Sequence, residues 1–348
     1  MDALEGFAEH VELVSTFRSF DADGDAARQE ALRAQGEALA QRMIAQWRAG
    51  PASLRPHLWF TYHVYYKAPD WLGPAVSTAL GIPYVIAEAS FAQKRASGPW
   101  AIGHQAAADA IGRARLVIAP SRDDVGGLHE LIPKERVVQL PPFLDAAPYE
   151  AAARSRKKLR AEHARKHHLD PRVPWIVVAA MMRGGDKLAS YRALAAALGR
   201  VGDLPWRLVV AGDGSARAEV EAALEAAAPG RASFLGTVGT KALAEVYAAC
   251  DLYAWPALNE AYGMAMLEAQ AAGLPVVSLA TRGVPDVVLD GRTGVLVKDE
   301  SLLADALRAL LTDAGRRTSL GKNAAAFIAA ERSVEAAAAR LKSLLAAL

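Results

Sequence analysis

The chain has 348 residues, which is long for one hydrophobic core and sufficient for two domains. Its composition, 52% hydrophobic and 22% charged, is typical of a globular protein, and a net charge of +2 gives no field that would demand a nucleic-acid partner. The single cysteine, Cys250, excludes an intramolecular disulfide, and we expect it in the core of a protein from a reducing, cytoplasmic setting. We find neither the run of about 18 apolar residues that a transmembrane helix needs nor the pattern of a signal peptide.

Apolar strands alternate with helices through the first half of the chain. After a helix tail at 1–9, the pattern predicts strands at 11–15, 58–62, 84–88, 115–119 and 137–140. Helices are expected at 26–47, 69–80, 100–114 and from about 121 to 131, the last of them capped by Ser121. This alternation predicts a parallel, doubly wound sheet.

The start of the chain departs from that pattern. A Rossmann-like half normally begins with a strand that becomes central in the sheet, followed by a ligand-binding turn. Here the chain begins in the helix that should follow them. We therefore expect a misplaced start site or an N-terminal truncation, or else a natural variant in which another strand closes the sheet.

Polar residues follow two of these strands, at the edge where parallel sheets bind ligands. His63 follows the strand 58–62, Glu88 ends the strand 84–88, and Lys94 and Arg95 lie in the next loop. Each of them is either a ligand-binding residue or a structural one. Four aromatic residues nearby can either stack on a sugar ring or fill the core: Tyr62, Tyr65, Tyr66 and Trp71.

The segment 146–168 is dense in Arg, Lys and His, and the prolines around it are typical of a linker between domains. It is expected either as a solvated connecting helix or as a basic face that contacts anionic lipid headgroups. Three histidines in this region have too few acids nearby to predict a metal site: His163, His167 and His168.

The second half predicts a complete Rossmann-like domain of six strands. The expected strands are 175–180, 207–211, 232–235, 252–254, 275–278 and 295–297, and the last expected helix is 334–348, capped by Ser333. The loop after the first of these strands reads MMRGGDK. Its glycines can bring backbone N–H groups close to a phosphate, and Arg183 and Lys187 add positive charge.

The segment 259–278 reads NEAYGMAMLEAQAAGLPVVS and carries two carboxylates, Glu260 and Glu268. Strong helix formers at 261–272 predict a helix that begins near Glu260 and ends at Gly273. Eight residues along such a helix would separate the carboxylates by about 12 Å. The unpaired N–H groups of the first turn favour an anion between them, and Gly263 allows a close approach. A nucleotide sugar has this order of groups: sugar, diphosphate, ribose.

This segment closely resembles the Glu-x7-Glu signature of the retaining family 4 glycosyltransferases, and the resemblance extends from about residue 9 to the C-terminus. It implies the GT-B fold, in which two Rossmann-like α/β domains face each other across a cleft, here with the first domain lacking its N-terminal strand and Gly-rich turn. The expected parts are an acceptor-side domain at 1–148, a basic linker at 149–170, a nucleotide-sugar-binding domain at 171–332 and a terminal helix at 333–348 that crosses back to the first domain.

The resemblance also implies roles for individual residues. Glu260 would hold the sugar hydroxyls and stabilise positive charge at the anomeric carbon, and Glu268 would accept hydrogen bonds from the ribose. Arg183 and Lys187 would neutralise the leaving diphosphate, so no metal and no other cofactor is expected. The backbone of the helix start would complete the diphosphate site, at Ala261, Tyr262, Gly263 and Met264. The loop 236–238 would contact the base, at Thr237 and Val238.

In the first half, the resemblance leaves a gap. A histidine that approaches the donor sugar in this family is matched here by Ala89, so that function is missing or moved. The candidates on the acceptor side are His63, Glu88 and Arg95.

We therefore expect a retaining glycosyltransferase that acts in polysaccharide, glycolipid or other glycoconjugate synthesis. Its partners would be a nucleotide-sugar donor and a glycan or lipid-linked acceptor, with no nucleic acid, in the cytoplasm or peripherally at the inner face of an anionic membrane. Two alternatives stay open. One is another enzyme on a similar double fold, such as a nucleotide-sugar epimerase or a phosphorylase. The other is a truncated or degenerate protein that binds a nucleotide sugar without transferring it.

Overall fold

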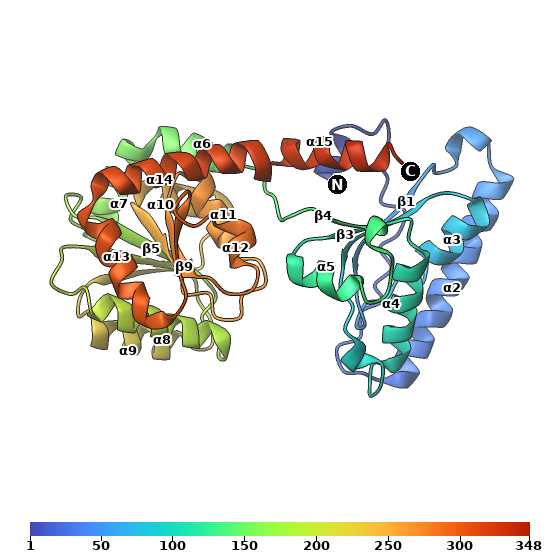
Figure 1. Ribbon diagram of the computed structural model, residues 1–348, viewed down its shortest axis with the longest axis horizontal. Helices are drawn as coiled ribbons and strands as arrows, with labels where there is room; N and C mark the ends of the chain where they lie inside the picture. Colours follow the sequence, from blue (N-terminus) through green and yellow to red (C-terminus); the bar gives the residue numbers. More distant parts are fainter. The chain divides into compact units, whose positions relative to one another are not determined.

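The computed structural model describes residues 1–348 and divides into two compact units, apart from the first two residues of the chain (Figure 1). The first unit comprises Ala3–Pro141 together with Leu341–Leu348, and the second comprises Pro142–Arg340. Each unit contains one parallel sheet with its own buried core. No helix of the structure combines the length and the apolar character that crossing a bilayer requires.

The first unit has a four-stranded sheet in the order β1-β2-β3-β4, and every pairing is parallel. Its strands are β1 (Trp59–Val64), β2 (Tyr84–Ala89), β3 (Leu116–Ala119) and β4 (Val137–Gln139). Its helices are α1 (Asp2–Glu5), α2 (Ala26–Ala49), α3 (Gly73–Leu80), α4 (Ala101–Arg113) and α5 (Arg122–Leu128). The predicted cap is confirmed, because the Ser121 hydroxyl accepts the N–H of Asp124.

One predicted strand of this unit is wrong. Residues 11–15 form no strand, so β1 lies at the edge of the sheet. The β-rich composition of this run is overridden because it packs through side chains instead: Val14 and Phe17 lie against the core.

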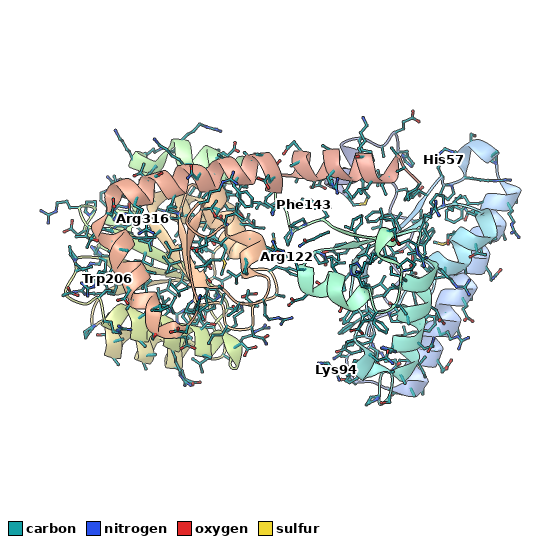
Figure 2. The ribbon with its side chains drawn as sticks, in the orientation of Figure 1. His57, Lys94, Arg122, Phe143, Trp206 and Arg316 are labelled. Atoms are coloured by element: carbon teal, nitrogen blue, oxygen red, sulfur yellow. The ribbon has the colours of Figure 1, made fainter.

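The second unit has the predicted six parallel strands, in the order β10-β9-β8-β5-β6-β7. The strands are β5 (Trp175–Ala179), β6 (Arg207–Ala211), β7 (Ala232–Gly236), β8 (Leu252–Ala254), β9 (Val276–Leu279) and β10 (Gly294–Val297). On one face of this sheet lie α8 (Asp186–Gly199) and α9 (Arg217–Ala227); on the other lie α10 (Thr240–Ala249) and α11 (Met264–Ala271) (Figure 1). Side chains fill the space between sheet and helices: Trp206, labelled in Figure 2, is buried and donates its indole N–H to the Val201 carbonyl just after α8.

The order of the strands reverses between β5 and β8. In open parallel sheets, ligands bind outside the carboxyl ends of the strands at such a switch point. The loops that follow β5 and β8 carry MMRGGDK and the start of the Glu-x7-Glu segment. The fold therefore brings these two motifs to one edge of the sheet.

The basic segment is not a solvated linker, because it forms two helices of the second unit. These are α6 (Ala147–Arg154) and α7 (Arg156–His167), and both pack against α10. The Asp251 carboxylate accepts hydrogen bonds from Arg156 at 2.7 Å and from Arg160 at 2.9 Å. These ion pairs, together with buried Leu159, hold α7 on the unit.

The C-terminal part of the chain is helical. It comprises α12 (Val284–Val287), α13 (Leu303–Thr312), α14 (Ala314–Phe327), a π-helical turn (Ile328–Arg332) and α15 (Val334–Leu345). The Ser333 hydroxyl accepts the N–H of Ala336 at 3.2 Å and caps α15, as predicted.

Candidate active site

The loop after β5 packs closely against two glycines of the loop after β6. A Cβ on Gly212 would lie 2.0 Å from the carbonyl oxygen of Ala180, and one on Gly214 would lie 2.2 Å from that of Met182, so neither position accepts a side chain. The Met182 N–H also donates to the Asp213 carbonyl at 2.9 Å. Arg183 follows directly and is exposed, with no hydrogen bond or ion pair to its side chain. Its charge is therefore available to a ligand.

The Glu-x7-Glu segment does not begin as a helix at Glu260. α11 begins at Met264, and its N-cap, Gly263, has the left-handed φ of 73°. Residues 257–263 form a loop instead, so Ala261 and Tyr262 lie outside the helix that was predicted to contain them. The carboxylates therefore do not share one helix axis, and the predicted spacing along that axis does not apply.

Contacts from distant elements hold this loop in a strained conformation. Ala257 and Asn259 have φ of 59° and 56°, which non-glycine residues seldom adopt. The Leu258 N–H donates to the Ser190 hydroxyl on α8 at 3.0 Å. The Asn259 side chain donates to Asp186 and accepts from Arg282, both at 2.8 Å. These tertiary bonds override the helix propensity of the alanines and methionines nearby.

Glu260 forms an ion pair with Lys187, and both side chains are about four-fifths buried. Lys187 is on α8, after β5, and Glu260 is in the loop after β8, so the pair spans the switch point. The Lys187 ammonium also lies 5.5 Å from the centre of the Trp255 ring. The structure thus brings together two residues that were predicted separately, and no local pattern indicates that they pair.

The N-terminus of α11 carries no capping side chain. The N–H of Met266 donates to the Gly263 carbonyl at 2.8 Å. The N–H groups of Met264 and Ala265 lie in the first turn, where the helix offers no carbonyl acceptor. A Cβ on Gly283 would lie 1.8 Å from the Ala261 carbonyl oxygen, so the chain after β9 packs directly beneath the loop. This helix end has free donors and the positive end of the helix dipole, which together suit an anion.

Glu268 lies one turn into α11 and is mostly buried. Its carboxylate accepts a hydrogen bond from the Tyr247 hydroxyl at 3.2 Å and interacts electrostatically with the Tyr149 hydroxyl. Burial raises the pKa of this carboxyl, and the two tyrosine hydroxyls lower it by less. The tyrosines come from α10 and α6, and sequence reasoning missed both.

Thr237 and Val238 follow β7, the outermost strand of the sheet, with Thr237 exposed and Val238 half-buried. β6 separates this strand from β5. The structure therefore places the two residues at the same carboxyl edge as the other loops but farthest from the switch point. Their predicted role at the base remains a prediction.

In the first unit, His63 and Glu88 lie side by side at the carboxyl ends of β1 and β2. The His63 Nδ1 is 3.2 Å from Glu88 Oε2, and the Tyr62 hydroxyl interacts electrostatically with this carboxylate. Burial raises the pKa of Glu88, but the interactions with His63 and Tyr62 outweigh it, so the pKa is lowered. Both backbones are left-handed, with φ of 65° and 57°. Such strain at a cluster of polar groups makes this pair a candidate functional site.

Arg95 is not part of this cluster. Its guanidinium lies over the rings of Tyr66, at 5.1 Å, and Trp100, at 5.9 Å. Ala89, which the resemblance matches to a histidine, is buried and offers no polar group. Tyr62 is 66% exposed and so is not a core residue, whereas Tyr65, Tyr66 and Trp71 are half-buried.

Comparison with protein families and curated proteins identifies relatives of this chain. Residues 175–313 match the family described as Glycosyl transferases group 1. A D-inositol 3-phosphate glycosyltransferase of Nocardia farcinica is 30% identical over 305 residues, which cover 84% of this chain and 66% of that protein. One from Rhodococcus erythropolis is 30% identical over 287 residues, covering 78% and 62%. The matched part of the chain spans less than two thirds of each of these relatives.

Two solved structures have the same fold. HepE from Anabaena in complex with UDP superposes with a TM-score of 0.69 at 18% identity, covering 89% of this chain and 82% of that one. WaaG, a glycosyltransferase involved in lipopolysaccharide biosynthesis, superposes with a TM-score of 0.63 at 18% identity, covering 96% and 85%. The predicted fold class is confirmed, with two parallel-sheet, Rossmann-like units of the GT-B type.

Proposed function

The chain belongs to the family 4 glycosyltransferases, and on that premise we propose that it transfers a sugar from a nucleotide diphospho-sugar to an acceptor with retention of anomeric configuration. The observation that carries this proposal is the Lys187–Glu260 ion pair, set on a strained loop beside the uncapped start of α11. A carboxylate, an ammonium and free backbone N–H groups at one switch point match the charges that develop when a sugar leaves a diphosphate.

In this proposal the second unit binds the donor. Glu260 accepts the sugar hydroxyls and stabilises the positive charge that develops at the anomeric carbon. Glu268 accepts from the ribose hydroxyls, and the loop at Thr237 and Val238 contacts the base. UDP is bound in the HepE structure, which makes a uridine nucleotide the first donor to test.

The leaving diphosphate is bound by donors and cations of this chain. The backbone at Ala261, Tyr262, Gly263 and Met264 supplies N–H groups, and Arg183 and Lys187 supply positive charge. Lys187 already neutralises Glu260, so a bound diphosphate would share this cation with the carboxylate. Two cations can offset the charge of the leaving group without a metal ion, and we propose no cofactor.

The acceptor is bound by the first unit. His63 and Glu88 can accept and donate hydrogen bonds to an acceptor hydroxyl, and the exposed ring of Tyr62 can pack against an apolar face. Arg95, held on two aromatic rings, contributes charge nearby rather than a direct contact with Glu88. Inositol phosphate appears in the names of the curated relatives, and a glycan or lipid-linked acceptor is the broader class that we propose.

The proposal also includes peripheral contact of the protein with the inner, cytoplasmic face of an anionic membrane. Along α7, Lys157, Arg165 and Lys166 are exposed and have no ion-pair partner. Such a face is attracted to anionic headgroups by about 1 kcal/mol for each basic residue near the surface. The pathway served would be polysaccharide, glycolipid or glycoconjugate synthesis.

A second candidate is binding of a nucleotide sugar without transfer. It is favoured by buried Ala89, which supplies no polar group where the family has a histidine, and by the edge position of β1. An epimerase on the same fold is a third reading. Turnover separates them: transfer consumes an acceptor, an epimerase releases an inverted sugar, and a binding protein does neither.

Calorimetric titration of UDP, GDP and ADP, and of their sugars, into the full chain and into Glu268→Ala tests the donor site. We expect one base to bind best and the substitution to weaken it by roughly 1–3 kcal/mol, the cost of leaving polar partners unpaired. Absence of binding by all three nucleotides to the folded protein would refute the donor site. Transfer to an added acceptor, with the anomeric configuration of the product assigned by NMR, then tests retention.

A further inference from the structure

Two tyrosines from separate helices converge on one carboxylate. Tyr247, on α10, donates its hydroxyl to Glu268 Oε2 at 3.2 Å, and Tyr149, on α6, lies beside Tyr247 and interacts electrostatically with the same carboxylate. Glu268 itself is on α11, which packs against both helices. The carboxylate is therefore held from two sides by groups that nothing in the Glu-x7-Glu signature includes.

Both tyrosines are buried, which suits them to hold the Glu268 carboxylate in one position. Tyr247 has no exposed surface and Tyr149 is 3% exposed, and their rings lie 6.3 Å apart. Burial raises the pKa of both phenols, so they stay protonated and can act as donors. A buried hydroxyl that lost its acceptor would cost free energy, so each tyrosine favours the one position of the carboxylate that satisfies it.

The carboxylate keeps capacity for a ligand. An ionised carboxylate has about four lone-pair positions, and the hydrogen bond from Tyr247 uses one of them. The Glu268 side chain is only partly buried, unlike the tyrosines behind it. Its remaining lone pairs can accept two neighbouring hydroxyls of a ligand at the carboxyl edge of the sheet.

We propose that Tyr149 and Tyr247 are positioning residues that hold the Glu268 carboxylate ready for the two ribose hydroxyls of the donor, and thereby set a preference for ribonucleotides over deoxyribonucleotides. The inference rests on the proposed function, because it assumes that Glu268 binds the donor. In this proposal the Glu268 carboxylate alone would prefer ribonucleotides only weakly, and the two buried tyrosines strengthen that preference. A pre-organised acceptor gains more from a matched hydroxyl pair because it loses less conformational freedom on binding.

The test is a double-mutant cycle between protein and ligand. The nucleoside diphosphate that binds most tightly among UDP, GDP and ADP is titrated into the full chain beside its 2′-deoxy counterpart. The variants are Tyr149→Phe and Tyr247→Phe, which keep the rings and remove only the hydroxyls. Tyr253→Phe is the matched control: Tyr253 is equally buried and packs on Tyr247, but its hydroxyl points to the Ala179 carbonyl at 3.4 Å.

We expect the wild type to prefer the ribonucleotide by roughly tenfold or more, as for hydrogen bonds to a charged group. Each tyrosine substitution should reduce that ratio several-fold, through weaker ribonucleotide binding and nearly unchanged binding of the deoxy form. Tyr253→Phe should keep the wild-type ratio. Glu268→Gln, which keeps the shape and removes the charge, should reduce the ratio even if a tyrosine variant folds poorly.

Three outcomes would overturn the inference. If the tyrosine variants weaken both ligands equally, the hydroxyls only support the fold. If the wild type binds a nucleotide but does not prefer the ribose form, Glu268 does not sense the ribose, and the inference fails while the proposed donor site stands. If no nucleotide binds to the folded wild type, the proposed function and the inference fail together.

Discussion

At the scale of single residues, the site depends on how one cation is shared. Lys187 compensates Glu260 in the unliganded protein and is also proposed to meet the diphosphate, whereas Arg183 has no partner. Their contributions should therefore differ in kind. Arg183 would act mainly on nucleotide affinity, and Lys187 would also act on the position of the Glu260 carboxylate.

Replacing Lys187 by methionine should lower kcat by roughly 100-fold, the usual cost of losing one group that stabilises charge in a transition state. Arg183→Ala should instead raise the dissociation constant of the nucleotide with a smaller change in kcat. Steady-state kinetics with the donor identified by titration measures both. The matched control is Arg192→Ala, because Arg192 is on α8, the helix that also carries Lys187, and pairs with Glu219 on the surface. Equal effects of Lys187→Met and Arg183→Ala on kcat would contradict the distinction.

Donor affinity should depend on the ionisation of Glu268. Burial raises the pKa of this carboxyl above its ordinary value, and the tyrosine hydroxyls only partly offset the rise. Only the ionised form can accept two hydroxyls, so affinity should be full above this pKa and fall as the pH is lowered through it. The diphosphate itself gains a proton near pH 6 or so. Titrations of wild type and Glu268→Gln from pH 8 to pH 5 separate the two, because the variant keeps only the ligand's dependence. Identical pH profiles would count against this role of Glu268.

At the scale of elements, the loop 257–263 is positioned by its surroundings rather than by its own sequence. Gly283 packs against it so closely that a Cβ would meet the Ala261 carbonyl oxygen at 1.8 Å, and this oxygen belongs to the backbone. The contact cannot relax by a rotamer change, so a side chain there must displace the loop that carries Glu260.

Gly283→Ala should therefore weaken nucleotide binding about tenfold or more while the second unit stays folded, since the displaced loop carries both Glu260 and the approach to α11. Calorimetry measures the nucleotide affinity, and thermal unfolding shows whether the second unit stays folded. Gly112→Ala is the control, because a Cβ at Gly112 on α4 meets open space. Unchanged affinity in Gly283→Ala would show that the loop position does not matter for the donor.

The elements that could be predicted from the sequence are those whose residues determine them locally. The strands of the second unit are short, nearly continuous apolar runs because both faces of the sheet are covered, and such runs are visible in one dimension. The start of α11 could not be predicted. Its upstream residues are good helix formers, but Ser190, Asp186 and Arg282 bind the loop from other elements.

The candidate site divides in the same way. Glu260, Glu268, Arg183 and Lys187 were identified because a spaced motif is a local property. The pairing of Lys187 with Glu260 joins residues 73 positions apart, and the bond from Tyr247 to Glu268 spans 21, so neither leaves a local pattern. The strain at His63 and Glu88 is also invisible in the sequence, because neither residue type signals a left-handed backbone there.

Asp251 joins three elements of the second unit. Its carboxylate accepts from Arg156 and Arg160 of α7 and from the backbone N–H of Trp175 at the start of β5. The basic segment is therefore attached through this partly buried carboxylate and through backbone carbonyls such as those of Ala248 and Val173, to which the two arginines also donate. This arrangement explains why a sequence dense in like charges forms a packed helix.

Asp251→Ala should destabilise the second unit by about 3 kcal/mol, because it leaves two arginines near the sheet without their partner. Chemical denaturation followed by far-UV circular dichroism measures the loss. Asp203→Ala is the matched control, since it removes an exposed carboxylate that pairs with Arg308. A similar small change in both variants would show that α7 is held by its other contacts alone.

At the scale of the whole molecule, the two units divide the proposed work. The second unit carries the switch-point loops, the uncapped helix and Glu268, and the first carries the strained His63–Glu88 pair. If the donor is bound by the second unit, a nucleotide alone should stabilise that unit and leave the backbone around β1 and β2 as it was. Ligand binding to the native state slows local opening wherever the contacts are made.

Hydrogen exchange measured by mass spectrometry, with and without the best nucleoside diphosphate, tests this division. We expect slower exchange in 181–187 and 257–268, because these loops would bind the diphosphate and the ribose, and no change in 62–66 and 86–90. Glu268→Gln at the same nucleotide concentration is the control and should show reduced protection in proportion to its lost affinity. Protection centred on His63 and Glu88 would instead mean that the first unit binds the nucleotide, and the assignment of donor and acceptor to the two units would have to be exchanged.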